Sequence, residues 1–291
     1  MNIKTIGVMS PGDMGQAIAL QLKVNGFAVH TALDGRSERS KALAREAGLT
    51  DVGSIERLTA GCDVILSIMN PAAALGFAGQ AARAIAAGHG KPLFVDCNAI
   101  APATMQAVEA AITGAGGRCC DGSIVGTPPR GKARASIYFS GAEAQALAAL
   151  ETPQLTVRVL GTRSGDASAL KMCYGAMNKG ITALMLETLM AARRLGVEDI
   201  FEAQMRETRP DVHDWIIGAL PVMPPKAYRW VPEMLQIAQT FEGVGMTPRI
   251  FEGAADMYEL VAKTALGRET PEGRDKSLGG KDVIKRLADE R

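Results

Sequence analysis

One proline-free stretch, from about Asp166 to Leu195, constrains the fold of this chain more than any other feature. It reads DASALKMCYGAMNKGITALMLETLMAARRL and is rich in residues of high helix propensity. Asp166 or Ser168 can cap its start, and Gly196 can stop it at the other end. We expect a helix of roughly 40 Å, which is long for a compact domain.

The sequence on the two sides of this stretch differs in kind. Before it, short apolar runs suited to buried parallel strands alternate with helical runs, and after it nearly every run is helical. This order predicts an α/β fold, with an N-terminal Rossmann doubly wound sheet in residues 1–165. The long interdomain helix, about 166–195, then opens an all-α domain in residues 166–291. The predicted strands are 4–9, 27–33, 63–69, 93–97, 118–126, 135–140 and 156–160, and the later helices are 197–206, 212–220, 231–244 and 249–266. The charged tail, 268–291, is expected to pack loosely around one short helix.

Composition excludes several classes of function. A net charge of +1 gives no general attraction for nucleic acid or membranes. No apolar run reaches the roughly 18 residues that a membrane span needs. The five cysteines show no metal-ligand spacing, and the chain has only three histidines. We therefore expect no metal, no nucleic-acid partner and no membrane partner, and we expect a reduced, cytoplasmic protein.

A glycine turn lies between the first predicted strand and a helix at 16–25. Such a turn binds dinucleotides because the bare backbone approaches the diphosphate, whose charge is stabilised by the helix N-terminus. Ser10 stands where the usual GxGxxG pattern has its first glycine. The residues expected to bind the cofactor are Ser10, Pro11, Gly12, Asp13, Met14 and Gly15.

The loop after the second strand bears on the choice between NAD and NADP. Asp34 favours NAD, because an acid at this strand end can bind the ribose hydroxyls. Arg36, Ser37 and Arg39 favour NADP, because arginine and a hydroxyl form a phosphate site. We expect NADP to be preferred, with Arg36 and Ser37 as ligands, and NAD remains possible.

Further along the chain, polar residues and a proline follow two buried strands. In open α/β sheets, ligands bind beyond the carboxyl ends of the strands. The nicotinamide side should therefore be lined by Met69, Asn70, Pro71 and Asn98.

The first turns of the long helix carry an unusual face. Lys171, Tyr174, Gly175 and Asn178 stand at i, i+3, i+4 and i+7, so they share one side of the helix. A face with a lysine, a tyrosine, a glycine and an asparagine is poorly suited to packing in a hydrophobic core. We interpret this face as the wall of a reaction site.

Taken together, these motifs resemble the β-hydroxyacid dehydrogenases, relatives of 6-phosphogluconate dehydrogenase and 3-hydroxyisobutyrate dehydrogenase. The family's GLGxMG turn reads SPGDMG here, and its Asp-X-Pro-Val-Ser-Gly-Gly motif aligns with residues 121–127. Its Lys-x-x-Asn-Asn motif aligns with Lys171, followed by Tyr174 and Gly175 in place of the asparagines. Val125 replaces the serine that typically contacts substrate. The chain therefore looks like a divergent branch with its own C-terminal domain.

The resemblance implies hydride transfer between the nicotinamide and a hydroxy acid or related secondary alcohol. Lys171 would act as the acid/base group, and Tyr174 would donate a hydrogen bond to the substrate oxygen. Asn178 stands where 6-phosphogluconate dehydrogenase carries an acidic glutamate, so decarboxylation is not expected. The resemblance also implies a homodimer. The substrate-binding residues would be Ser123, Val125, Gly126 and Thr127.

Two other readings remain open from the sequence. An imine reductase of the same architecture would reduce a cyclic C=N bond, but relatives of that kind usually lack the lysine. A non-catalytic dinucleotide sensor would bind the cofactor without turning over any alcohol, and loss of Lys171 would not affect it.

Overall fold

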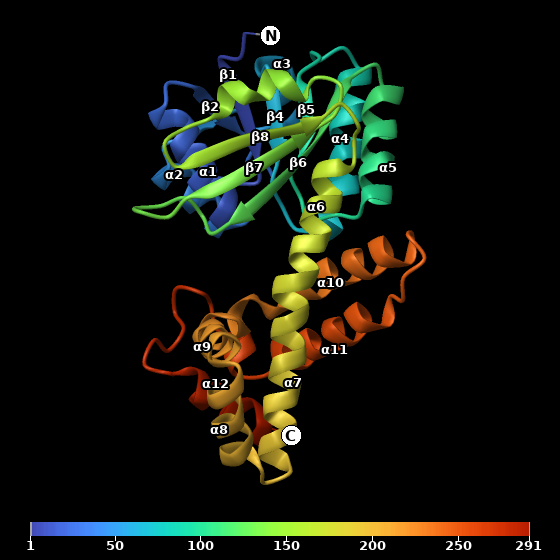
Figure 1. Cartoon of the computed structure of the whole chain (residues 1–291). Coiled ribbons are helices and arrows are strands. Elements are labelled where there is room, and N and C mark those ends of the chain that lie inside the picture. The colour runs from blue at the N-terminus through green and yellow to red at the C-terminus, as the bar shows by residue number, and fades with distance from the viewer. Residues whose placement is uncertain (1, 291) are drawn as a thin grey trace. The chain divides into compact units, whose positions relative to one another are not determined.

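The computed structural model of the chain describes residues 2–290 (Figure 1). Contacts within the chain divide it into two units, Met1–Met172 and Cys173–Arg291. The division falls inside helix α6, Asp166–Gly175.

Within the described residues, the first unit holds an eight-stranded sheet in the order β3-β2-β1-β4-β5-β6-β7-β8. The β6–β7 pair is antiparallel, and the other neighbouring pairs are parallel. The sequence did not predict the short strand β3, whose two residues are both exposed. The strands are β1 Thr5–Met9, β2 Ala28–Thr31, β3 Thr50–Asp51, β4 Val64–Ser67, β5 Leu93–Asp96, β6 Arg118–Gly126, β7 Ala135–Ser140 and β8 Leu155–Gly161.

Helices cover both faces of this sheet, which confirms the predicted doubly wound fold. On one face, Ile18 and Leu22 of α1 pack with Leu147 and Leu150 of η2 against the strands. On the other face, α3, α4 and α5 supply the apolar side chains. The buried layers force the strands to be apolar on both sides, so they read as continuous hydrophobic runs in the sequence. The elements are α1 Asp13–Val24, α2 Glu38–Glu46, α3 Ile55–Gly61, η1 Pro71–Ala73, α4 Ala74–Ala86, α5 Pro102–Gly114 and η2 Ala144–Leu150.

The long proline-free stretch is helical from Asp166 to Arg194, in three consecutive segments. Between α6 and α7 (Ile181–Arg194) lies a π-helix, η3, at Ala176–Gly180. The Tyr258 hydroxyl donates to the Lys179 carbonyl oxygen over 2.6 Å. This contact satisfies a carbonyl in the widened segment, where α-helical bonding is interrupted. The sequence did not indicate the π-helix, because Tyr258 is remote from it along the chain.

The second unit is helical, as predicted. Its core contains the fully buried side chains of Ile216, Met234, Ile237 and Tyr258. Pro221 and the pair Pro224–Pro225 interrupt the α-helices, and short 3₁₀ turns form there. The elements are α8 Glu198–Thr208, α9 Pro210–Ala219, η4 Leu220–Val222, η5 Pro224–Lys226, α10 Ala227–Glu242, α11 Arg249–Lys263, η6 Leu266–Arg268 and α12 Gly280–Asp289.

The short helix predicted in the tail is present as α12, Gly280–Asp289, but the prediction of loose packing was wrong for this helix. Helix α12 buries Val283, Ile284 and Leu287, and it packs against α7 and α9 of the same unit. The apolar positions recur at helical spacing among charged residues, so the tail forms a strongly amphipathic helix. The high charge of the tail lies on the solvent side of this helix and does not prevent packing.

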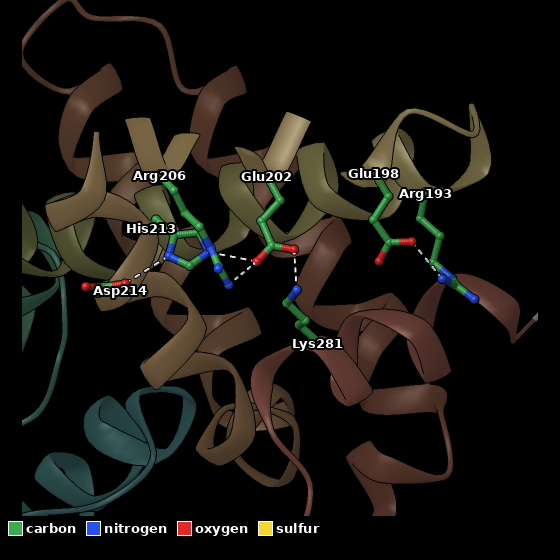
Figure 2. A network of polar contacts seen from close by, with 7 residues as sticks. All are labelled: Arg193, Glu198, Glu202, Arg206, His213, Asp214 and Lys281. Carbon is green, nitrogen blue, oxygen red and sulfur yellow. Dashed lines mark hydrogen bonds and ion pairs between the residues drawn. The ribbon is translucent and has the colours of Figure 1, made fainter. Parts of the chain in front are cut away.

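An ion network centred on the buried side chains of Glu202 and His213 ties α12 to α8 and α9 (Figure 2). Glu202 accepts hydrogen bonds from Arg206 Nη2 and Lys281 Nζ, both at 2.6 Å. His213 Nε2 lies 3.2 Å from Glu202, and its Nδ1 lies 2.9 Å from Asp214. Burial works to raise the pKa of Glu202, but the hydrogen bonds from Lys281 and His213 outweigh it and hold that pKa below its usual value. The buried His213 therefore packs within the helical unit.

All five cysteines are free thiols. Cys62, Cys97, Cys119 and Cys120 are buried in the first unit, and burial raises the pKa of each of them. Cys173, on α6, is exposed. Among the described residues, no helix has both the length and the hydrophobicity needed to cross a membrane.

Candidate functional site

The turn between β1 and α1 has the geometry expected of a diphosphate cradle. Gly15 cannot carry a side chain, because a Cβ there would lie 2.1 Å from the Ser10 carbonyl oxygen. A Cβ on Gly12 would meet no protein atom within 4 Å. The protein's own packing therefore requires Gly15, whereas Gly12 leaves space for a ligand to approach the backbone.

Gly12 is also the N-cap of α1, and no side chain caps this helix. The first N–H groups of a helix lack intrahelical partners, and its dipole favours negative charge there. In contrast, Ser37 caps α2 and Ser54 caps α3. The turn and the start of α1 therefore fit the diphosphate of a dinucleotide.

A hollow of about 550 Å³ lies beyond the carboxyl ends of β1 and β2. Asp34 and Arg36 both line it, so the two residues that bear on the choice of cofactor face the same space. Ser37 is not among its lining residues. The Ser37 hydroxyl accepts from Ser40 N at 3.2 Å and so caps α2. Met69, which the sequence placed on the nicotinamide side, lines this hollow as well.

Asn98 joins the ends of β4 and β5. Its Oδ1 accepts from Met69 N at 2.5 Å, and its Nδ2 donates to Ser67 Oγ and to Asp96 Oδ2, both at 2.9 Å. Asn98 is 3% exposed, so its side chain supports the strand ends from within. The neighbouring Asn70 accepts from Ala72 N at 3.1 Å and caps the short helix that begins at Pro71.

Buried Asp121 fixes the start of α6. Its Oδ1 accepts from Ser168 Oγ at 2.7 Å, and its Oδ2 accepts from Ser168 N at 2.8 Å and Ser140 Oγ at 3.1 Å. Ser140 Oγ also accepts from Ala167 N at 3.0 Å. Burial raises the pKa of the Asp121 carboxyl, against the hydrogen bonds from Ser168 and Ser140. The Asp121 carboxylate, on strand β6, therefore caps the start of helix α6.

One turn further along α6, Lys171 Nζ donates to the Ile124 carbonyl oxygen over 2.6 Å. Ile124 lies three residues after Asp121 on β6, so the strand holds α6 at two points. The result places the lysine amine at the carboxyl end of β6. Sequence analysis chose Lys171 and named Ser168 as a possible helix cap, but it did not predict the contact of Ser168 with Asp121. A carboxylate inside an apolar strand was the available signal for that contact.

The four predicted substrate residues have different surroundings. Ser123 is fully buried, and its hydroxyl has no hydrogen-bond partner among the described residues. Val125 is half-buried, whereas Gly126 and Thr127 are exposed. Gly126 has a φ of 115°, and a Cβ there would lie 3.1 Å from the Arg134 carbonyl oxygen, so the strand end requires glycine.

The remaining candidates lie in the second unit. Tyr174 is 44% exposed. Asn178 Nδ2 donates to the Tyr174 carbonyl oxygen over 3.1 Å, so this amide bonds within its own helix. Lys179, which sequence analysis overlooked, forms an ion pair with Glu233 and lies 5.3 Å from the centre of the Trp230 ring. This buried cluster packs the π-helix against α10.

The fold and the turn define a class of protein, the NAD(P)-dependent oxidoreductases. Residues 5–154, about half of the chain, match the model of the NAD binding domain of 6-phosphogluconate dehydrogenase, and the chain belongs to this family. Residues 192–261 match a domain of unknown function, DUF1932. The C-terminal match confirms a distinct second domain within the family.

Individual relatives agree with this assignment. A solved conserved protein of unknown function, described as structurally similar to 3-hydroxyacid dehydrogenases, is 31% identical with a TM-score of 0.67, over 89% of this chain and 96% of that one. An uncharacterised protein of Methanothermus fervidus is 28% identical over 70% of this chain and 76% of its own length. The 3-hydroxyisobutyrate dehydrogenase of Mycobacterium tuberculosis shares the fold, with 17% identity, a TM-score of 0.71 and coverage of 98% and 99%.

Gly12→Ala should separate ligand binding from folding. The new methyl group meets no protein atom, so the thermal unfolding midpoint should stay close to that of the wild type. It would occupy the space that a diphosphate needs, so affinity for NADPH and NADH should fall about tenfold or more. Fluorescence titration measures the affinity. Gly15→Ala is the contrasting variant and should lose stability as well, whereas unchanged binding by Gly12→Ala would contradict the assigned cradle.

Because of Asp96, the free energy of unfolding should fall as the pH rises. Burial raises its pKa from 3.8 to about 6, so between these values the folded state binds more protons than the unfolded state. The stability of Asp96→Asn relative to the wild type should therefore increase from about pH 4.5 to about pH 7 in urea unfolding. Asp63→Asn should show the opposite trend, and only below about pH 4, because backbone hydrogen bonds from Thr5 and Lys4 lower the pKa of Asp63 below 3.8. The same trend in both variants would refute this account.

Proposed function

We propose that this protein transfers a hydride between a nicotinamide dinucleotide, preferably NADP, and a hydroxy acid or related secondary alcohol. The observation that carries the proposal is the contact between Lys171 Nζ and the Ile124 carbonyl oxygen. It holds an amine at the carboxyl edge of the sheet, where open α/β folds bind their ligands.

Residues of the first unit would divide the work of binding. The turn at Gly12 and the start of α1 would hold the diphosphate, and the hollow lined by Asp34 and Arg36 would take the adenosine end. Gly126 and Thr127 are exposed at the end of β6 and would contact a carboxylate of the substrate. The bound nicotinamide supplies the hydride acceptor for oxidation and the donor for reduction.

Lys171 would move the proton. In alcohol oxidation its neutral amine takes the hydroxyl proton as the C–H bond gives up its hydride, and in reduction its ammonium returns that proton to the oxygen. A free lysine titrates near 10.4, so the site has to favour the neutral form for this role. Tyr174 and Asn178 remain candidates for contacts with the substrate.

Asp121 would act as a positioning residue. It bonds to the first turn of α6 through Ser168 and does not bond to Lys171 itself. The strand that carries it also carries Ile124, so strand and helix set the location of the amine together.

The proposal is tested by a screen of hydroxy acids, polyols, aromatic alcohols and cyclic imines, followed by NADPH absorbance. With the best alcohol, Lys171→Ala should lower kcat by about 100-fold or more, the scale for losing an acid/base group. NADPH affinity should change little, because the turn and the hollow are intact. Lys91→Ala, on the loop before β5, is a control that should leave kcat unchanged.

Other results would decide against the proposal. Turnover of cyclic imines alone, unaffected by Lys171→Ala, would support an imine reductase. Tight binding of NADPH without turnover of any compound would support a sensor.

Cofactor preference has its own test in Arg36→Ala. Arg36 lines the adenosine-side hollow, and a charge-assisted bond to the extra phosphate of NADP is the expected contact. Affinity for NADPH should fall about tenfold or more, while affinity for NADH should change little. Arg45→Ala, an exposed residue of α2 outside the hollow, should affect neither. Equal losses of affinity for NADPH and NADH would show that Arg36 does not bind the extra phosphate of NADP.

A further inference from the structure

The turn between β1 and α1, which would bind the diphosphate, carries a negatively charged side chain next to the position of that negatively charged ligand. Asp13 is the first residue of α1, directly after Gly12. An acidic residue stabilises a helix N-terminus in the free protein. A diphosphate bound at the same N-terminus would face this carboxylate, and like charges at close range repel.

The guanidinium of Arg130, from a distant part of the chain, forms an ion pair with this carboxylate. Arg130 Nη1 donates to Asp13 Oδ1 over 2.7 Å, and its Nη2 donates to the Asp13 carbonyl oxygen over 3.0 Å. The same Nη2 donates to Gln16 Oε1 over 2.6 Å. Gln16 is 3% exposed, so the guanidinium is held against a fixed side chain. All three contacts fall on the first turns of α1.

Arg130 belongs to the loop between the antiparallel strands β6 and β7, which follows Gly126 and carries Thr127 at its start. A second bond anchors this loop to the same helix, from Gln21 Nε2 to the Pro129 carbonyl oxygen over 3.2 Å. The loop therefore reaches α1 at two points, one of them at the cofactor turn.

We propose that Arg130 completes the dinucleotide site by cancelling the charge of Asp13. When Asp13 is paired with Arg130, the N–H groups and the dipole of α1 face the diphosphate without the repulsion of an unpaired carboxylate. This inference rests on the proposed binding of a dinucleotide at the turn, and it adds a residue from the substrate-side loop to the cofactor site.

The role differs from that of Arg36. Arg36 faces the adenosine-side hollow, where NAD and NADP differ, so its loss should affect one cofactor. Asp13 lies at the diphosphate, which the two cofactors share. Loss of Arg130 should therefore weaken NADH and NADPH by the same factor.

The ion pair contributes little to folding. The side chains of Arg130 and Asp13 are 44% and 25% exposed, and exposed pairs add little stability. Variants of either residue should therefore fold, with thermal unfolding midpoints near that of the wild type. Binding then reports on the charge alone.

The experiment is a double-mutant cycle on the full chain, with dissociation constants for NADPH and NADH measured by calorimetry. Arg130→Ala should weaken both cofactors by roughly tenfold to 100-fold, the scale of a charge-assisted contact. Asp13→Asn alone should bind as well as the wild type or more tightly. The double variant should return to within about threefold of the wild type, because the repelling carboxylate is gone.

Arg118→Ala is the matched control. It breaks an ion pair with Glu143 of the same 2.7 Å length and similar exposure, 39% and 37%, at the amino end of β6. It should leave both dissociation constants unchanged.

The outcomes separate this inference from the proposed function. A double variant as weak as Arg130→Ala would mean that Arg130 binds the phosphates itself, which overturns charge cancellation. Unchanged binding by Arg130→Ala would overturn the inference and leave the proposed function intact. A wild-type chain that binds neither cofactor would overturn both.

Discussion

The candidate site depends on how strand β6 holds helix α6. Asp121, buried within the strand, accepts hydrogen bonds from the backbone and side chain of Ser168, and Ile124 accepts from Lys171 one turn later. A buried carboxylate is costly unless it is hydrogen-bonded, so this cap stabilises one arrangement of the helix start. The same arrangement locates the amine on which the proposed chemistry relies. Folding and the proposed function therefore depend on the same short segment of strand.

Much of the fold could be predicted from the sequence, because buried parallel strands read as apolar runs and the long helix contains no proline. The errors have a common physical origin in long-range packing. The π-helix at Ala176–Gly180 involves Tyr258, far along the chain. The tail was judged by its charge, although the period of its apolar residues was the better guide. The predicted homodimer stays a prediction.

Part of the candidate site could also be predicted from the sequence, because some of its residues belong to local sequence patterns. Glycine turns and strand-end residues are local signals, so the turn at Gly12 and the strand end at Asn98 could be selected from sequence. Contacts between remote segments could not. Arg130 lies more than a hundred residues beyond Asp13, and nothing in either local sequence indicates that the two side chains meet. Ser37, predicted as a phosphate ligand, also caps the helix that follows it, and its role toward the phosphate stays a prediction.

The distribution of thiols has a practical consequence. Four cysteines are buried with pKa values raised by that burial, whereas Cys173 is exposed on α6, two residues beyond Lys171. Alkylating reagents react with the accessible thiolate, so the native chain offers a single attachment point without any engineering. A fluorophore placed there would sit on the helix that carries the candidate amine and would report ligand-dependent changes at that helix in real time.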